Sequence, residues 1–116
     1  MQPEEKEKLL KYLTDALDAA EQIKMDTLGL SSKSFFTNNI KWLVERGIEI
    51  ISEALKRASQ IESKLPISDL HKIYATRNKI AHEYDIVDPN MLFTIVTKYI
   101  PVLIIELANY IKTLDE

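Results

Sequence analysis

Apolar side chains recur every three or four residues along most of this chain, which is the spacing of one face of an α-helix. The first such stripe falls within residues 3–25, where Glu4 and Glu5 occupy the first turn and complement the helix dipole. Its members are Leu9, Leu13, Ala16, Ala20 and Ile23. The pattern therefore predicts a long first helix with one buried face.

A second, longer stripe begins after Gly29 and the Ser31-Ser32 pair have broken the pattern. Its members are Phe36, Ile40, Leu43, Gly47, Ile50, Ala54, Ala58 and Ile61. It predicts the central helix of the fold. Because glycine costs a helix about 1 kcal/mol relative to alanine, Gly47 indicates the close approach of another helix rather than a break.

A third stripe follows Pro66 and opens with the capping-type residues Ser68 and Asp69. It predicts a helix that ends near Tyr84 or Asp85. A sequence of such helices joined by short connections favours antiparallel packing of neighbours.

A fourth helix is predicted to start at Asp88 and Pro89, a capping aspartate followed by a first-turn proline. Pro101 should kink or restart this helix because proline has no N–H to donate. The apolar run at residues 102–105 leaves no polar face, so it is either central or covered by another chain, and we expect a homodimer. The stripes together predict an all-α fold, an up-and-down bundle of four to five helices.

Length and composition fit this prediction. The 116 residues suit one domain over residues 1–116, and two glycines in total favour helices over a turn-rich β fold. The absence of cysteine excludes disulfides and thiolate metal sites. With no signal-like segment, and with an apolar run at 102–105 too short to cross a bilayer, we expect a cytoplasmic protein without a membrane partner.

The net charge of −3 has the wrong sign for a protein that holds nucleic acid by charge alone. Any RNA contact would have to be local, around His71, Lys72, Arg77 and Lys79, or a second chain would have to gather basic groups into one cleft.

Four polar groups interrupt the third stripe. Asn78 and His82 are four residues apart and share one helix face, whereas Arg77 and Tyr84 share the face that carries the apolar residues. Burying a guanidinium without a partner is costly. Arg77 therefore needs an open edge, a bound anion, or an ion pair with a core carboxylate, for which Glu53 is a candidate. On its own, His82 is also compatible with a capped or solvated side chain, which is the commoner role of a lone histidine on a helix.

The motif Arg77-Asn78 followed by His82-x-Tyr84 resembles the signature of the HEPN superfamily: four residues separate arginine from histidine, and tyrosine follows two positions later. The segment 50–54 and the C-terminal half resemble the HepT-like subgroup, the toxin partners of minimal nucleotidyltransferase antitoxins. Ser52 stands where that subgroup usually has glycine. The resemblance covers nearly the whole chain and is strongest from about residue 48.

This resemblance implies a metal-independent endoribonuclease toxin, without a cofactor, that cleaves tRNA or mRNA at a composite cleft of a homodimer. Arg77 and His82 are the implied catalytic residues, as charge stabiliser and proton acceptor. Asn78 would orient the imidazole or bind phosphate. Tyr84 is the implied acceptor of AMP from a cognate nucleotidyltransferase antitoxin, a modification that would switch the site off.

Two other functions are compatible with the same residues. In the first, the chain is a non-catalytic partner subunit of a minimal nucleotidyltransferase, and Arg77 and His82 bind a nucleotide and cleave nothing. The acidic net charge favours this alternative, whereas the joint presence of arginine, histidine and tyrosine favours the nuclease. In the second, the chain is a structural dimerisation bundle and the polar motif is coincidental. The sequence offers no convincing set of metal ligands.

Overall fold

The computed structural model describes residues 1–31, 37–82 and 88–116. These residues form helices α1 (Pro3–Asp26), α3 (Asn38–Ile61), α4 (Leu70–His82) and a last helix that consists of α5 (Pro89–Thr94), the π-helical turn η1 (Ile95–Tyr99) and α6 (Ile100–Asp115). Within these ranges there is no strand, so the all-α prediction is confirmed. The expectations for Phe36, Tyr84 and Asp85 lie outside the described residues.

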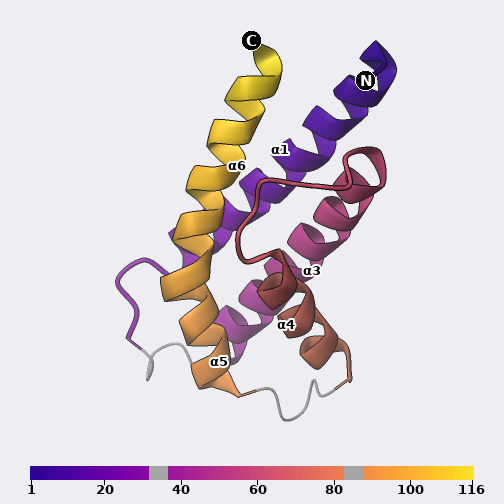
Figure 1. Cartoon of the computed structure of the whole chain (residues 1–116). Helices are drawn as coiled ribbons and strands as arrows, with labels where there is room; N and C mark the ends of the chain where they lie inside the picture. The colour runs from indigo at the N-terminus through magenta and orange to yellow at the C-terminus, as the bar shows by residue number, and fades with distance from the viewer. Residues whose placement is uncertain (32–36, 83–87) are drawn as a thin grey trace.

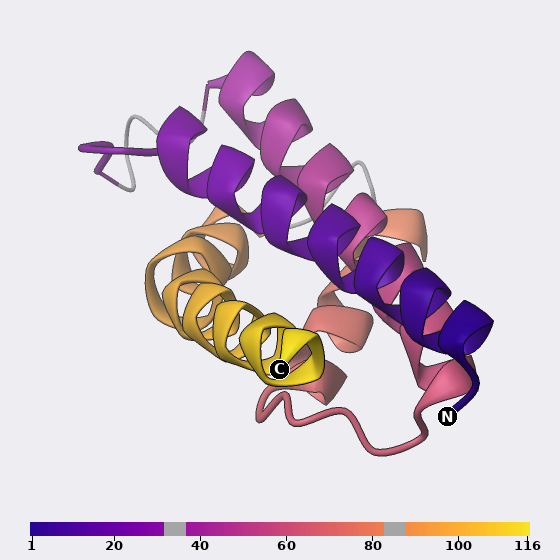
Figure 2. The ribbon, with the colours of Figure 1, turned by 90° about the horizontal axis from the view of Figure 1, so that it is seen from above.

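The helices run alternately up and down. α1 and α4 run in one direction and α3 and the last helix in the other, so both termini lie at the same end of the bundle (Figure 1). α1 packs against both α3 and α6, and α3 packs against α4 (Figure 2). The bundle predicted from the sequence is confirmed, and α3 is its central helix.

The buried face of α1 is the predicted stripe: Leu9, Leu13, Ala16, Ala20 and Ile23 are all in the core. The prediction for α3 is partly wrong, because Leu43 and Ile50 are 38% and 40% exposed while Val44, Ile48 and Ile51 are fully buried. Helix α3 contacts both α1 and α4, so the centre of its buried face lies one position away from the predicted stripe.

Gly47 lies at a close contact between α1 and α3. A Cβ atom placed on it would lie 2.7 Å from both Cγ1 and Cδ1 of Ile23, which is 2% exposed. Such a distance is too short for two carbon atoms, so only glycine fits without movement of the isoleucine. The predicted close helix approach at Gly47 is confirmed.

The start of α4 is tied to α6 by one side chain. The carboxylate of Glu106 accepts hydrogen bonds from the backbone N–H of Ser68, at 3.1 and 3.2 Å, and from its hydroxyl at 3.1 Å. The carbonyl of Asp69 accepts the first helical bonds, from the N–H groups of Lys72 and Ile73. Ser68 and Asp69 therefore open the helix, as the sequence predicts.

The last helix begins at Asp88, whose side chain accepts a hydrogen bond from the N–H of Asn90 at 2.9 Å. The irregularity expected at Pro101 is the π-helical turn Ile95–Tyr99, which directly precedes α6. A π-turn changes the backbone hydrogen-bond pattern where proline cannot donate, so the helix continues through Pro101.

Pro89–Asp115 is long enough and apolar enough, by length and composition, to cross a membrane, although its longest uninterrupted apolar run is short. In the bundle, the face that carries Ile100, Leu103 and Leu107 is buried. Core packing therefore explains much of its apolar character. Val102 and Ile105 remain 40% and 61% exposed.

Candidate functional site

Arg77 lies at the edge of the buried face of α4. Ile73, Thr76 and Ile80 point into the core, and the Thr76 hydroxyl donates a hydrogen bond to the carbonyl of Lys72 at 2.8 Å. Arg77 follows the buried Thr76 and is itself half-buried, so it lies at the boundary between the core and solvent. This placement requires a polar environment around the guanidinium.

A groove of about 720 Å³ provides that environment. We call it the Arg77 groove. Three helices contribute its lining: Lys11, Tyr12, Asp15, Asp18 and Ala19 from α1; Arg46, Glu49, Ile50, Glu53, Ala54 and Arg57 from α3; and Arg77 from α4. Arg77 is therefore brought together with charged residues that are far from it in the sequence.

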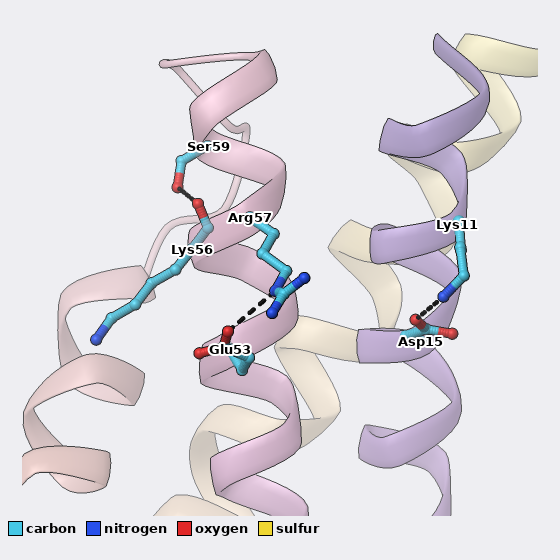
Figure 3. Close-up of polar contacts among 6 residues, drawn as sticks. All are labelled: Lys11, Asp15, Glu53, Lys56, Arg57 and Ser59. Atoms are coloured by element: carbon cyan, nitrogen blue, oxygen red, sulfur yellow. Dashed lines mark hydrogen bonds and ion pairs between the residues drawn. The ribbon is translucent and has the colours of Figure 1, made fainter. Parts of the chain in front are cut away.

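Three ion pairs neutralise most of the cations in the Arg77 groove. They are Lys11 with Asp15 at 3.0 Å, Arg46 with Glu49 at 3.6 Å, and Arg57 with Glu53 at 2.9 Å. Figure 3 shows the first pair on α1 and the third on α3, each with its members one turn apart. All three pairs are partly exposed, so each contributes little to the stability of the fold.

Arg77 has no ion pair or hydrogen bond with any residue in the described part of the chain. The pairing with Glu53 considered from the sequence is wrong, because the Glu53 carboxylate accepts its hydrogen bond from Nε of Arg57. Arg77 is thus the groove's unpaired cation among the described residues. A partly buried guanidinium with free donors is suited to bind an anion.

Arg57 lines the same groove and, unlike Arg77, has a carboxylate partner on its own helix. Hydrogen bonding to Glu53, followed by the influence of Tyr12 on α1, raises the pKa of the Arg57 guanidinium above its ordinary value.

Asn78 and His82 lie on α4 but do not line the Arg77 groove. Both side chains are exposed, and His82 is the last described residue of the helix. Five positions separate His82 from Arg77, which places the two side chains about 140° apart around the helix axis. One chain therefore does not bring Arg77 and His82 onto the same face, and Tyr84 lies outside the described residues.

A second hollow, of about 230 Å³, adjoins the groove because Arg46 and Glu49 line both. Trp42, Glu45 and Ile80 complete its lining. Burial raises the pKa of the Glu45 carboxyl, with a further rise from Glu49 and an opposing effect of Lys41. The indole of Trp42 is 66% exposed, so a large apolar side chain faces solvent beside the C-terminal half of α4.

Two hydroxyls lack partners in the described part of the molecule. Ser52 Oγ and the Tyr74 hydroxyl are buried without a hydrogen bond. Ser52, which takes the place of the subgroup's usual glycine, is 1% exposed and packed in α3. The ammonium of Lys56 lies 5.4 Å from the centre of the Tyr74 ring, a cation–π distance.

Among residues 1–31, 37–82 and 88–116, no group of three or more histidine, aspartate or glutamate side chains is arranged to hold a metal ion. The groove itself offers the Arg77 guanidinium and the surrounding carboxylates, and the imidazole of His82 lies outside it.

Residues 16–110 match the family described as Ribonuclease HepT-like, a match that includes all of α3 and α4. The chain belongs to the HepT-like ribonuclease family. The protein named "Putative RNase MJ0125" from Methanocaldococcus jannaschii is 30% identical to it over 107 residues, 90% of this chain and 92% of the relative. No solved structure matches the chain.

The groove residues of α1 and α3 are the part of the candidate site that the sequence did not reveal. Lys11, Asp15 and Asp18 recur at helical spacing, which is also the pattern of an ordinary solvated face. The small residues Ala19 and Ala54, which lie between the charged ones in the groove, are the signal that could have marked a hollow.

Proposed function

We propose that this HepT-like ribonuclease is a metal-independent endoribonuclease toxin, and that its active site is completed by a second copy of the chain. The observation that supports this most directly is Arg77, which is half-buried in a groove and unpaired among the described residues. Such a guanidinium gains free energy from a bound anion, and the phosphodiester of RNA is the anion that a ribonuclease meets.

The proposed reaction uses two groups. The imidazole of His82 removes the proton from a ribose 2′-hydroxyl, and the 2′-oxygen attacks the adjacent phosphorus. The bond from phosphorus to the 5′-oxygen breaks, and that oxygen takes a proton from solvent. Arg77 stabilises the charge that develops on the phosphoryl oxygens, and Asn78 orients the imidazole or contacts the phosphate. The products are a 2′,3′-cyclic phosphate and a 5′-hydroxyl.

The divergence of Arg77 and His82 around α4 supports a composite site, because a second chain can place its His82 opposite the Arg77 of the first. Trp42, an exposed apolar side chain in the hollow that adjoins the groove, is suited to such a contact. We therefore propose a homodimer whose cleft contains both residues.

Regulation is proposed from the resemblance described above. A cognate minimal nucleotidyltransferase antitoxin would transfer AMP to Tyr84, two positions beyond His82. The added anionic group would compete with an RNA phosphate for Arg77 and obstruct His82, so the modified protein would be inactive.

The test is cleavage of a mixed RNA pool that contains tRNA and mRNA by unmodified protein in excess EDTA. Wild type should produce 2′,3′-cyclic phosphate ends, and His82→Ala should reduce the rate at least a hundredfold. Asn109→Ala, which changes no charge at an exposed position of α6, is the control and should cleave RNA at the wild-type rate. Equal inactivity of wild type and His82→Ala over the whole pool would contradict the nuclease.

Two observations favour a second candidate, a non-catalytic nucleotide-binding partner of a minimal nucleotidyltransferase. Histidine lies outside the groove, and the groove carries as many carboxylates as cations. In that case the unmodified protein would bind the nucleotidyltransferase and a nucleotide but would release no cyclic phosphate. Binding of nucleotide without cleavage of any RNA would therefore identify this function.

A further inference from the structure

Most of the Arg77 groove is close to electrically neutral. Lys11, Arg46 and Arg57 are each paired with a carboxylate, and Arg77 is the unpaired cation among the described residues that line it. A second phosphate would gain little attraction from paired cations. The remainder of the groove is therefore better suited to an uncharged part of a nucleotide than to more of the RNA backbone.

The floor of the groove is apolar. Ala19, Ile50 and Ala54 line it between the charged residues, and Ile50 is 40% exposed. A volume of about 720 Å³ is within the range of sites that bind small organic ligands. A nucleobase has a flat apolar face and a polar edge, so it can cover this floor while its edge meets the charged rim.

Asp18 provides the acceptor that a base edge needs. It lies on α1, is exposed, and has no ion pair or hydrogen bond with any residue that the structure describes. A carboxylate only accepts hydrogen bonds, and it can accept two in parallel. Guanine presents two adjacent donors, N1–H and the N2 amino group, on its Watson–Crick edge, whereas uracil presents a single N–H there.

We propose that the Arg77 groove binds a guanine base of the RNA next to the phosphate held by Arg77, and that Asp18 determines this preference. The proposal rests on the proposed function, because it takes Arg77 as the phosphate-binding residue. The base lies over Ala19 and Ile50, and its N–H donors meet the Asp18 carboxylate.

The first experiment measures base preference. Wild type, Asp18→Asn and the matched control Asp115→Asn digest RNA of randomised sequence, and both ends of each product are sequenced. Wild type and the control should enrich guanine at one position beside the cleaved bond by about tenfold over uracil. Asp18→Asn should lose most of this enrichment, whereas Asp115→Asn should keep the wild-type pattern. Enrichment that persists in Asp18→Asn, or its absence in wild type, would overturn the proposal.

The second experiment separates the base site from catalysis. Titration calorimetry compares guanosine and uridine monophosphates, each as the 3′ and the 5′ isomer, on the unmodified protein. At least one guanosine isomer should bind about tenfold more tightly than its uridine counterpart, and Asp18→Asn should remove the difference. If the protein cuts no RNA but still binds a guanosine isomer more tightly, the proposed function is wrong and the base site stands. Equal affinities for guanosine and uridine monophosphates contradict the base site whether or not RNA is cut.

Discussion

Glu53 and Arg57 form an ion pair one turn apart on α3, with Nε of Arg57 2.9 Å from the Glu53 carboxylate. Glu53 also lines the groove that Arg77 enters from α4. Because Arg57 lies on the same helix as Glu53, the local pair forms and Arg77 is left without a partner among the described residues. Among the described residues, the pair of Glu53 with Arg57 thus leaves the Arg77 guanidinium available to bind an anion.

This relationship predicts that Arg77→Ala folds as well as wild type. No described ion pair or hydrogen bond is lost, so the free energy of unfolding should change by no more than about 0.5 kcal/mol. Urea denaturation followed by circular dichroism measures it. A loss of several kcal/mol would instead mean that Arg77 belongs to a buried structural pair.

Gly47→Ala should destabilise the bundle. Alanine gains about 1 kcal/mol in helix propensity, but its Cβ would lie 2.7 Å from two atoms of the buried Ile23. Overpacking of this kind costs about 1–3 kcal/mol, so we expect a net loss in the free energy of unfolding. Thermal and urea denaturation provide the measurement.

The double variant Gly47→Ala with Ile23→Val supplies the control, because valine lacks Cδ1, one of the two atoms that the new Cβ meets. It should recover part of the stability lost in Gly47→Ala, even though Ile23→Val alone costs about 1 kcal/mol. Strictly additive losses would show that the contact with Ile23 is not the cause.

Glu106 should stabilise the start of α4 through Ser68. Glu106→Gln keeps an acceptor and should cost less than Glu106→Ala, which leaves the Ser68 N–H and hydroxyl without their partner. A double-mutant cycle of Glu106→Ala with Ser68→Ala, measured by urea denaturation, should give a coupling of about 1 kcal/mol. A coupling near zero would mean that the contact contributes nothing to the free energy of unfolding.

The homodimer can be tested with the chain's single tryptophan. Trp42 is 66% exposed in one chain, so its fluorescence should resemble that of a solvated indole when the protein is dilute. If a second copy covers it, the emission maximum should shift to shorter wavelength as concentration rises, in step with the mass from light scattering. Trp42→Ala should weaken association by about tenfold or more. If the dimer dissociates without a change in the Trp42 emission maximum, the interface does not include Trp42.

The buried face of a helix was predictable where the rest of its circumference is charged. Leu9 and Leu13 of α1 fall on the predicted face because the opposite side of that helix is charged. Helix α3 has apolar residues around much of its circumference, so periodicity alone selected Leu43 and Ile50 although Val44 and Ile51 are the buried ones. The neighbours of a central helix, and not its own sequence, decide which of its apolar faces is covered.

Of the candidate site, only the motif that contains Arg77 and His82 was predictable from the sequence. Arg77 and His82 stand out because polar groups interrupt an apolar stripe, which a single sequence can show. Asp18 and Arg57 could not be assigned to the site, because charged residues at helical spacing are also typical of a solvated surface. Asp18 and Arg57 line one groove with Arg77 because α1 and α4 both pack against α3.

The most direct test of the account is the single-turnover rate of RNA cleavage by Arg77→Ala in excess EDTA, measured beside wild type and Lys112→Ala. Lys112 is an exposed cation in the last turn of α6 and does not line the groove. We predict that Arg77→Ala is slower by at least a hundredfold, with an unchanged free energy of unfolding, while Lys112→Ala cleaves like wild type. Cleavage by Arg77→Ala at the rate of active wild type would contradict the assignment of Arg77 as the group that stabilises the reacting phosphate.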